Sequence, residues 1–261
     1  MVEKLVVHAL THPGALRPAN EDTIAVGDWT AANTLKQPKR FEFTVNQATD
    51  EPLLVAVADG MGGHGGGDVA SYSAVAQVQR HLPNLSSAAG MARALESANA
   101  ALYDMMREGE GPPGMGTTIA ALALTPGGVV VGNVGDSRIY RFDGDSLVQL
   151  STDDTPGPKL ADGRTALHTS PIITQSLGGH PDFAGIEPHV AEEPPAPGVR
   201  YLLCSDGLTD LVGPEAILAR LNVRDDAESV SALFSDAMAA GGRDNISIVL
   251  VRLLESGAAG P

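Results

Sequence analysis

Residues 53–71 read LLVAVADGMGGHGGGDVAS, and this stretch changes character twice. Its first six residues are apolar and lead into an acid, Asp59, which is the pattern of a buried β-strand that ends at a turn. A run of glycines follows, and glycine permits close backbone approach and unusual φ angles. The apolar positions beyond it predict a helix over 69–81. The stretch therefore predicts a strand, a glycine-rich loop that begins at an acid, and a helix.

The segment GMGGHG at 60–65 also matches the G-x-G-x-x-G pattern of a dinucleotide-binding Rossmann unit. Two features argue against that interpretation. A second helix, not a strand ending in a ribose-binding acid, is expected after the first helix. Asp59 would also repel a pyrophosphate group placed on the glycines. We therefore treat the match as superficial.

The rest of the chain alternates strand groups with helix pairs. Short apolar runs bounded by Gly, Asp or Pro predict strands, and alternation followed by an Asp-Gly-Asp turn predicts a hairpin. Apolar residues at three- and four-residue steps predict helices. The predicted strands are 53–58, 119–124, 129–134, 137–142, 147–150, 199–204 and 246–253, and the predicted helices are 69–81, 88–107, 214–221 and 227–240.

Helices that arrive in pairs, with hairpins between strands, fit stacked sheets covered by helices better than a parallel sheet with single crossovers. We predict an α+β fold, a four-layer αββα sandwich of two mostly antiparallel sheets flanked by helix pairs. It forms a single domain over residues 1–255, with a frayed tail at 256–261. Residues 151–198 hold 8 of the 18 prolines and little periodicity, which predicts an irregular, flap-like segment.

Acidic residues stand where the predicted strands meet loops. Asp59, Asp136 and Asp206 each follow an apolar run, Asp244 precedes the last strand, and RPANED at 17–22 adds two more acids. One Asp-Gly pair is ordinary turn chemistry, but four acids at strand ends are not explained by turns alone. Carboxylates gathered at one edge would repel each other and raise their pKa values unless cations neutralise them. Oxygen donors without a Cys or His pattern favour Mg²⁺ or Mn²⁺ over Zn²⁺, although Ca²⁺ also suits them.

These motifs, taken together, resemble the metal-dependent PP2C (PPM) family of protein phosphatases, in particular its bacterial branch. They occur in the family's order from near one end of the chain to near the other, and that collinearity makes the resemblance far more specific than a single motif. The matching stretches are RPANED (17–22), VADGMGGHGGGDVAS (57–71), GMGTT (114–118), VGNVGDSRIYRF (131–142), CSDGLTD (204–210) and GGRDNIS (241–247).

The resemblance implies roles for the acids. It implies two ions, Mn²⁺ or Mg²⁺, bridged by Asp59. The further ligands implied are Asp206 and Asp244 at the first ion, and the Gly60 carbonyl with Glu21 or Asp22 at the second. A third ion is implied at Asp136 together with Asp206.

The resemblance also implies how phosphate is bound and cleaved. Arg17 resembles the family's phosphate-binding arginine, whose planar donors suit a bidentate grip, and Asn245 resembles a supporting residue. The implied reaction is hydrolysis of phosphoserine and phosphothreonine in proteins by a metal-bridged water, without a covalent intermediate. Phosphorylated proteins and an opposing Ser/Thr kinase are the partners implied. The alternative is a catalytically weak PP2C-like module that binds phosphoproteins.

Several other residues invite catalytic interpretations that we do not favour. Cys204 is not followed by the arginine that thiolate phosphatase chemistry needs, so we predict a buried structural cysteine. Ser137 has no base partner in the sequence, and Arg138 is expected to order the acidic cluster by charge pairing. His64 lies in the glycine loop, and the acid that protonates the leaving group is left open.

Composition excludes several other classes of protein. The 261 residues carry a formal charge of −15 without a Lys/Arg cluster, which argues against nucleic-acid binding. No stretch reaches membrane-spanning length, and the N-terminus lacks the apolar run of a signal peptide. A single cysteine fits a reducing compartment. We therefore expect a cytoplasmic protein, a monomer by default, without membrane or nucleic-acid partners.

Overall fold

A computed structural model describes residues 2–32, 39–46, 51–62, 66–125, 127–156, 172–194 and 196–255. Its strands form two six-stranded sheets, called sheet 1 and sheet 2, and a small three-stranded sheet. All recorded strand pairs are antiparallel. The predicted α+β sandwich is confirmed. The tail at 256–261 lies outside the described residues.

Sheet 1 contains both ends of the described chain. Its central pair joins the first strand to the last, with Leu5 opposite Leu253 and Leu10 opposite Ile248. Its order is β11 (Leu147–Gln149), β10 (Arg138–Phe142), β14 (Arg200–Cys204), β15 (Ile246–Glu255), β1 (Val2–His12) and β4 (Lys39–Asn46). The sequence interpretation did not predict β1, although this strand lies near the middle of the sheet.

Sheet 2 contains the strand that leads into Asp59. Its order is β13 (His189–Glu193), β9 (Gly128–Val134), β8 (Ile119–Thr125), β5 (Leu53–Ala58), β2 (Thr23–Val26) and β3 (Trp29–Ala32). Beside it lies the small sheet, in the order β12 (Leu177–Gly178), β7 (Gly116–Thr117) and β6 (Gly60–Met61). The antiparallel pairing, and the second helix that follows the first, contradict a Rossmann unit.

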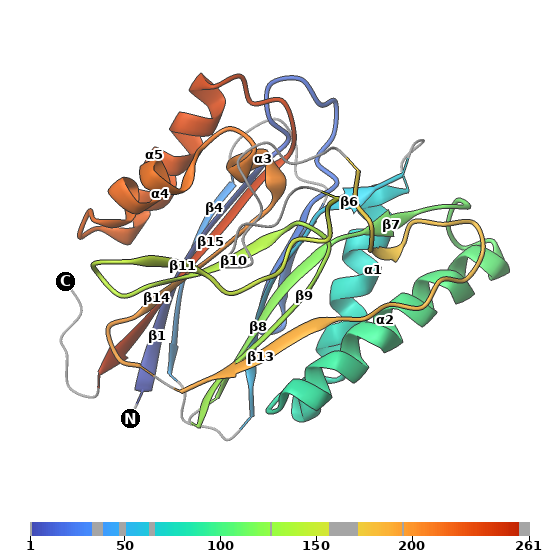
Figure 1. The fold of residues 1–261 in the computed structure, drawn as a ribbon, viewed down its shortest axis with the longest axis horizontal. Helices are drawn as coiled ribbons and strands as arrows, with labels where there is room; N and C mark the ends of the chain where they lie inside the picture. The colour runs from blue at the N-terminus through green and yellow to red at the C-terminus, as the bar shows by residue number, and fades with distance from the viewer. Residues whose placement is uncertain are drawn as a thin grey trace.

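Helices cover both outer faces of the sandwich (Figure 1). On the side of sheet 2 lie α1 (Gly67–Arg80) and α2 (Ala88–Glu108), joined by the short helix η1 (Leu82–Asn84). On the side of sheet 1 lie α3 (Asp206–Thr209), α4 (Pro214–Leu221) and α5 (Asp226–Ala239). All four predicted helices are therefore present, with boundaries displaced by at most two residues.

Three apolar clusters fill the spaces between the four layers. The first, with Leu54 and Leu95, lies between sheet 2 and the pair α1–α2. The second, with Leu5, Val57 and Tyr201, joins the inner faces of the two sheets. The third, on the other side of sheet 1, packs that sheet against α3, α4 and α5. Strands buried on both faces explain why many predicted strands are continuous apolar runs without alternation.

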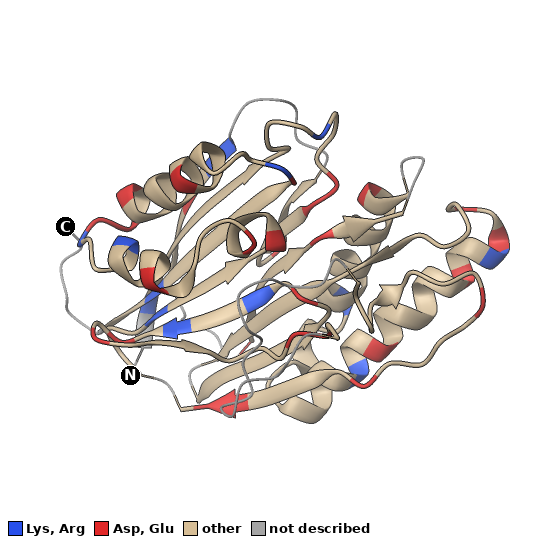
Figure 2. Ribbon diagram, turned by 45° about the horizontal axis from the view of Figure 1, so that its top comes forward, with Lys and Arg blue, Asp and Glu red and all other residues tan. Residues whose placement is uncertain are grey.

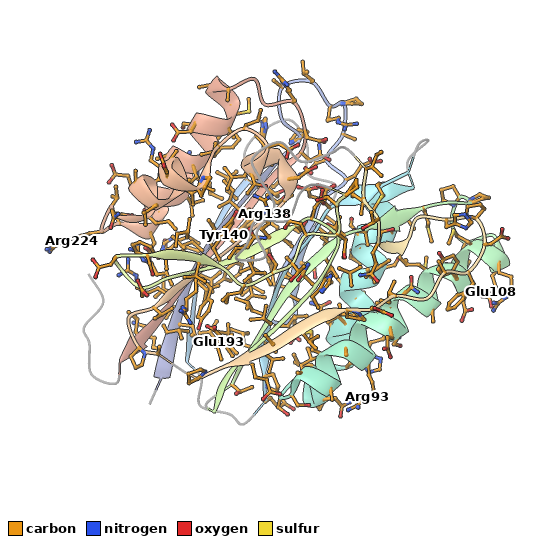
Figure 3. The ribbon with its side chains drawn as sticks, viewed as in Figure 1. Arg93, Glu108, Arg138, Tyr140, Glu193 and Arg224 are labelled. Carbon is orange, nitrogen blue, oxygen red and sulfur yellow. The ribbon has the colours of Figure 1, made fainter. Side chains whose placement is uncertain are left out.

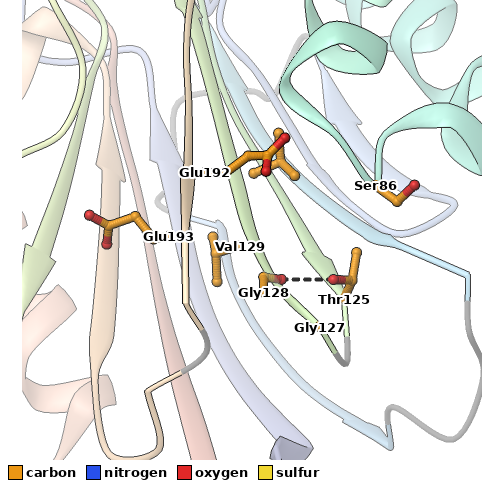
Figure 4. Close-up of a pocket in the computed structure, with 8 residues that line it drawn as sticks. Ser86, Thr125, Gly127, Gly128, Val129, Glu192 and Glu193 are labelled. Carbon is orange, nitrogen blue, oxygen red and sulfur yellow. Dashed lines mark hydrogen bonds between the residues drawn. The ribbon is translucent and has the colours of Figure 1, made fainter.

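Strand β13 ties three of the layers together, although the sequence interpretation expected residues 151–198 to be irregular. Glu192 and Glu193 point to opposite sides of this strand (Figure 4). Glu192 accepts a hydrogen bond from the Ala88 amide at the start of α2, at 2.7 Å. Glu193 pairs with Arg141 of β10 at 3.0 Å. A cavity of about 380 Å³ lies at this end of sheet 2, far along the strands from the acidic loops.

Lys and Arg residues lie scattered over helices, strands and loops, interspersed with acids (Figure 2). Among the described residues, no helix combines the length and the apolar character needed to cross a membrane.

Candidate metal centre

Loops from both sheets meet at one end of the sandwich around a cavity of about 480 Å³. Every site residue predicted from the sequence lines this cavity except Asp22, which lies in the protein beneath it. The lining residues are Arg17, Glu21, Asp59, Gly60, Met61, Gly62, Thr118, Asp136, Ile173, Asp206, Asp210, Asp244 and Asn245.

Asp59 follows β5 directly, and backbone hydrogen bonds fix its position. Its amide donates to the Thr118 hydroxyl at 3.2 Å, and its carbonyl accepts from the Thr118 amide at 2.9 Å. The Thr117 hydroxyl donates to the same carbonyl at 2.8 Å. Both the amide and the carbonyl of Asp59 are thus hydrogen-bonded to the GTT segment before β8.

Gly60 stands where a side chain would not fit. A Cβ atom there would lie 2.1 Å from the Gly67 carbonyl oxygen and 2.6 Å from that of Glu21. The start of α1 and the loop that carries Glu21 therefore both touch the backbone next to Asp59. This close approach requires glycine at position 60. It brings Asp59 and Glu21 to the same cavity wall.

Asn245 joins the loop before β2 to the loop before β15. Its side-chain oxygen accepts from the Glu21 amide at 2.8 Å. Its side-chain amide donates to the carbonyls of Pro13, at 3.1 Å, and Ala19, at 2.9 Å. All the polar groups of this buried side chain are used, so Asn245 positions Glu21 relative to its neighbour Asp244.

Asp22 is fully buried and accepts hydrogen bonds from two serines. Ser247 donates at 2.6 Å and Ser205 at 2.9 Å to the same carboxylate oxygen. Glu21, in contrast, lines the cavity. The two neighbouring acids thus occupy different environments, which the sequence could not distinguish.

Arg17 lies at the exposed mouth of the cavity. Its guanidinium donates to the Asp244 carboxylate at 2.6 Å, while more than half of its side chain is exposed.

The acids raise one another's pKa values. Desolvation, and then the charges of Asp22 and Asp206, raise the pKa of Asp59 well above its usual range. The pKa of Asp206 is also raised, first by desolvation and then by Asp136. Desolvation raises the pKa of Asp136 to about 6 and that of Asp22 to about 7. Such a cluster favours either protonation or a bound cation.

The donor set fits hard divalent cations. One oxygen of Asp22 and one of Asp206 are buried without a hydrogen-bond partner, and carboxylate oxygens of this kind are the ligands that Mg²⁺ and Mn²⁺ prefer. Within the described ranges, no three His, Cys, Asp or Glu side chains form a group that could hold a metal ion as they stand. The acids nevertheless share the lining of one cavity.

Comparison with known proteins shows the family. The family model described as Protein phosphatase 2C matches residues 36–255. The chain belongs to the protein phosphatase 2C family. The resemblance found in the sequence motifs is thereby confirmed.

Similar proteins within the PP2C family include two curated bacterial enzymes. The serine/threonine protein phosphatase PstP of Mycobacterium tuberculosis is 35% identical over 212 residues, which are 77% of this chain and 40% of PstP. The serine/threonine phosphatase stp of Listeria innocua is 32% identical over 221 residues, 77% of this chain and 85% of stp. The chain thus spans less than half the length of PstP and most of stp.

Solved PP2C structures share the fold. The crystal structure of the M. tuberculosis PstP phosphatase has a TM-score of 0.76 at 31% identity, covering 96% of this chain and 100% of that one. The PstP catalytic domain in complex with two manganese ions has a TM-score of 0.74 at 31% identity, with the same coverage.

Sequence reasoning missed Asp210 as part of the PP2C cavity. It lines the cavity, and its charge contributes to the raised pKa values of Asp206 and Asp136. The signal was present, because Asp206 and Asp210 are four residues apart in CSDGLTD and a helical turn places such residues on one face. The backbone amide of Asp210 donates to the Asp206 carbonyl at 2.8 Å, which confirms the turn.

Arg138 is expected from the sequence to order the acidic cluster by charge pairing, but its ion pair is with Asp153, which is not among the residues that line the cavity. It forms a buried bidentate ion pair with Asp153, with its shortest contact at 2.7 Å. It also donates to the hydroxyl of Tyr140, its neighbour on β10 (Figure 3), at 3.2 Å. Ser137 forms a hydrogen bond with Thr118 at 2.7 Å, so it supports the Asp59 backbone indirectly.

Cys204 is buried, and desolvation raises the pKa of its thiol to about 12. A thiolate nucleophile at this position is therefore excluded under ordinary conditions. His64 lies outside the described residues.

Proposed function

We propose that this chain hydrolyses phosphoserine and phosphothreonine in proteins, in a reaction that depends on divalent metal ions. The observation that carries the proposal is the acidic cavity itself. Several carboxylates with raised pKa values face a space that also presents one arginine at its mouth. A phosphate group would be repelled by such a cavity unless cations were bound there.

The acids have distinct roles in this proposal. Asp59 would be shared by two ions, and Asp206 and Asp244 would complete the first site. Glu21 and the Gly60 carbonyl would complete the second site, because both residues line the cavity. Asp22, held by two serine hydroxyls beneath the cavity, would support this site from below. Asp136 with Asp206 would hold a third ion.

Bound between these carboxylates, two divalent ions would activate the attacking water and stabilise the charge that develops on the phosphoryl group. The manganese ions of the PstP catalytic domain support Mn²⁺, and the donor chemistry equally supports Mg²⁺. Arg17 grips two phosphoryl oxygens, and Asn245 keeps the Glu21 loop in place.

The proposed substrates are phosphorylated proteins. The enzyme that phosphorylates them, and that this chain would oppose, is a Ser/Thr kinase. The names of the similar bacterial phosphatases support this substrate class. We further propose that residues 1–255 act as one domain and that the protein works as a monomer in the cytoplasm, without nucleic acid.

The proposal is tested by hydrolysis of p-nitrophenyl phosphate and of a phosphothreonine peptide, with EDTA, Mg²⁺ or Mn²⁺. Turnover is expected only with metal, and Asp59→Asn is expected to lose both turnover and Mn²⁺ binding while its circular dichroism spectrum is unchanged. Losing one bridging ligand should lower kcat/KM at least about 100-fold.

The matched control is Asp182→Asn, the same change at an exposed acid that does not line the cavity. A fully active Asp59→Asn protein would show that the cavity is not the active site. A folded wild-type chain that binds the phosphopeptide but is inactive with every metal would favour the phosphoprotein-binding alternative.

A further inference from the structure

Asp154 is a nearly buried acid outside the proposed metal ligands, and each of its polar groups has a partner. Only 11% of its side chain is exposed. One carboxylate oxygen accepts from the Gly135 amide at 2.8 Å and from Gln175 at 3.0 Å. The other oxygen contacts His189 at 2.8 Å. The Asp154 amide donates to the Gly135 carbonyl at 3.0 Å, and its carbonyl accepts from the Thr174 amide at 2.7 Å.

The first partner of Asp154 adjoins a cavity acid. Gly135 is bound to Asp154 through both its amide and its carbonyl, and it directly precedes Asp136. Gly135 has φ near +96°, and a Cβ atom there would lie 2.6 Å from two side-chain carbons of Thr118. This backbone is therefore confined between Thr118 on one side and Asp154 on the other, so Asp154 limits where the Asp136 carboxylate can lie.

The second partner adjoins another cavity-lining residue. Thr174, whose amide donates to the Asp154 carbonyl, directly follows Ile173, which lines the cavity. We call this part of the lining the Ile173 rim. Gln175 extends the connection, because its side chain also bonds the backbone of Glu187 in both directions, at 2.5 and 3.1 Å. His189 then joins Asp154 to the edge strand β13.

We infer that Asp154 is a positioning residue that couples the Asp136 loop to the Ile173 rim, so that one side chain sets both the proposed third metal site and the surface a phosphopeptide meets. The inference rests on the proposed function and deepens it. If Asp154 served stability alone, it would not need to bond both Gly135, which precedes Asp136, and Thr174, which follows Ile173.

The main test uses Asp154→Ala, with Asp182→Ala as the matched control on the same segment. Binding of Mn²⁺ is measured with electron paramagnetic resonance, which gives the concentration of Mn²⁺ that remains free. We expect the weakest class of Mn²⁺ sites to lose affinity roughly 10- to 100-fold, as for other residues that orient metal ligands. We also expect KM for a phosphothreonine peptide to rise more than KM for p-nitrophenyl phosphate, because the residues that flank the phosphothreonine give the peptide more contacts with the lining than the small substrate has.

Two further variants keep the test decisive if Asp154→Ala does not fold. Asp154→Asn keeps an oxygen for Gly135 and Gln175 and places a side-chain NH2 group beside Nε2 of His189. It is expected to restore most of the Mn²⁺ affinity and most of the peptide KM. Gln175→Ala removes the side-chain link between Asp154 and the rim, together with the two bonds to Glu187, and leaves the contacts of Asp154 with Gly135 and His189 in place. It should therefore raise the peptide KM and leave the Mn²⁺ titration unchanged.

The inference is overturned if Asp154→Ala lowers only the free energy of unfolding and leaves the Mn²⁺ titration and both KM values unchanged. It is equally overturned if Gln175→Ala leaves the peptide KM unchanged. Mn²⁺ binding is measured without turnover. A failure of the inference about Asp154 can therefore be distinguished from a failure of the proposed phosphatase function. An inactive wild type with a shifted Mn²⁺ titration in Asp154→Ala would reject the proposed function and keep the metal part of the inference.

Discussion

Hydroxyl groups, as well as acids, determine how the carboxylates of the cavity are held. Ser247 donates to Asp22 and contacts Thr11 at 2.8 Å, and Thr11 accepts in turn from Asn20 at 2.7 Å. All of these groups are buried. A buried carboxylate costs free energy unless its oxygens are hydrogen-bonded, so this network offsets part of the cost of burying Asp22 by satisfying one of its two oxygens. It joins β1, β15 and the loop of the RPANED motif directly beneath the cavity.

Cys204 provides a test that separates metal-dependent chemistry from thiol chemistry. Because burial raises the pKa of its thiol to about 12, the native protein should not react with Ellman's reagent at about pH 8, and one thiol should react after unfolding in urea. Cys204→Ala should keep the phosphatase activity at a cost of about 1 kcal/mol in the free energy of unfolding. Rapid labelling of the native thiol, with loss of activity, would contradict this assignment.

At the scale of elements, the two sheets are joined along one edge by aromatic side chains. Trp29 of β3, the edge strand of sheet 2, contacts Phe41 and Phe43 of β4, the edge strand of sheet 1. The ring centroids are 4.3 and 4.8 Å apart. These contacts cover apolar surface that would otherwise be exposed where the inner faces of the sandwich end. They give a structural role to residues that the sequence left without one.

Phe43→Ala should therefore weaken the association of the two edge strands. Removing a half-buried ring should lower the free energy of unfolding by about 2 kcal/mol, measured by urea titration. Trp29 is the only tryptophan of the chain, so its fluorescence should also shift to longer wavelength as it becomes more exposed. The control is Thr44→Ala on the exposed face of the same strand, which should change neither quantity. An unchanged midpoint in Phe43→Ala would mean that the aromatic contact contributes little.

At the scale of the whole molecule, the fold concentrates part of its large negative charge at one end. The chain carries a formal charge of −15, and the loops of both sheets bring several acids to one cavity. Their mutual repulsion and desolvation oppose folding unless protons or cations bind. Folding free energy, pH and metal binding are therefore linked in this protein.

The sign of that linkage can be tested in EDTA. The pKa values of Asp22, about 7, and Asp136, about 6, lie above those of unfolded aspartate, so the folded state binds more protons between about pH 4 and 7. Their stabilising protonation is complete below about pH 4 and is lost as the pH rises through 6 to 7. The free energy of unfolding in EDTA should thus be about 2 kcal/mol higher at about pH 5.5 than at about pH 7.5.

Added Mn²⁺ should reverse this trend, because metal binds the deprotonated acids and stabilises the protein more at the higher pH. Asp22→Asn, which keeps an acceptor for the two serines, should lose part of the pH dependence in EDTA, while the raised pKa values of Asp59, Asp136 and Asp206 maintain the remainder. Urea titrations at both pH values measure each effect. Equal or greater stability in EDTA at the higher pH would contradict the raised pKa values.

The sequence by itself determined the class of fold, the helix pairs and the acids at strand ends. These follow from local patterns, because apolar runs, turn residues and helical periodicity act between residues that are near in the chain. The same local patterns, in collinear order, were sufficient to indicate the family. They could not identify β1 as a central strand, since its pairing partner β15 lies at the other end of the chain.

Only the tertiary structure decided how the site is assembled. It buried Asp22 and left Glu21 on the cavity wall, although the two are adjacent in sequence. It also joined Asp154 to Gly135, which precedes Asp136, and to Thr174, which follows the cavity residue Ile173. Burial, hydrogen-bond partners and pKa values depend on groups that are distant in sequence and meet only when the sheets stack, so no local pattern carries that information.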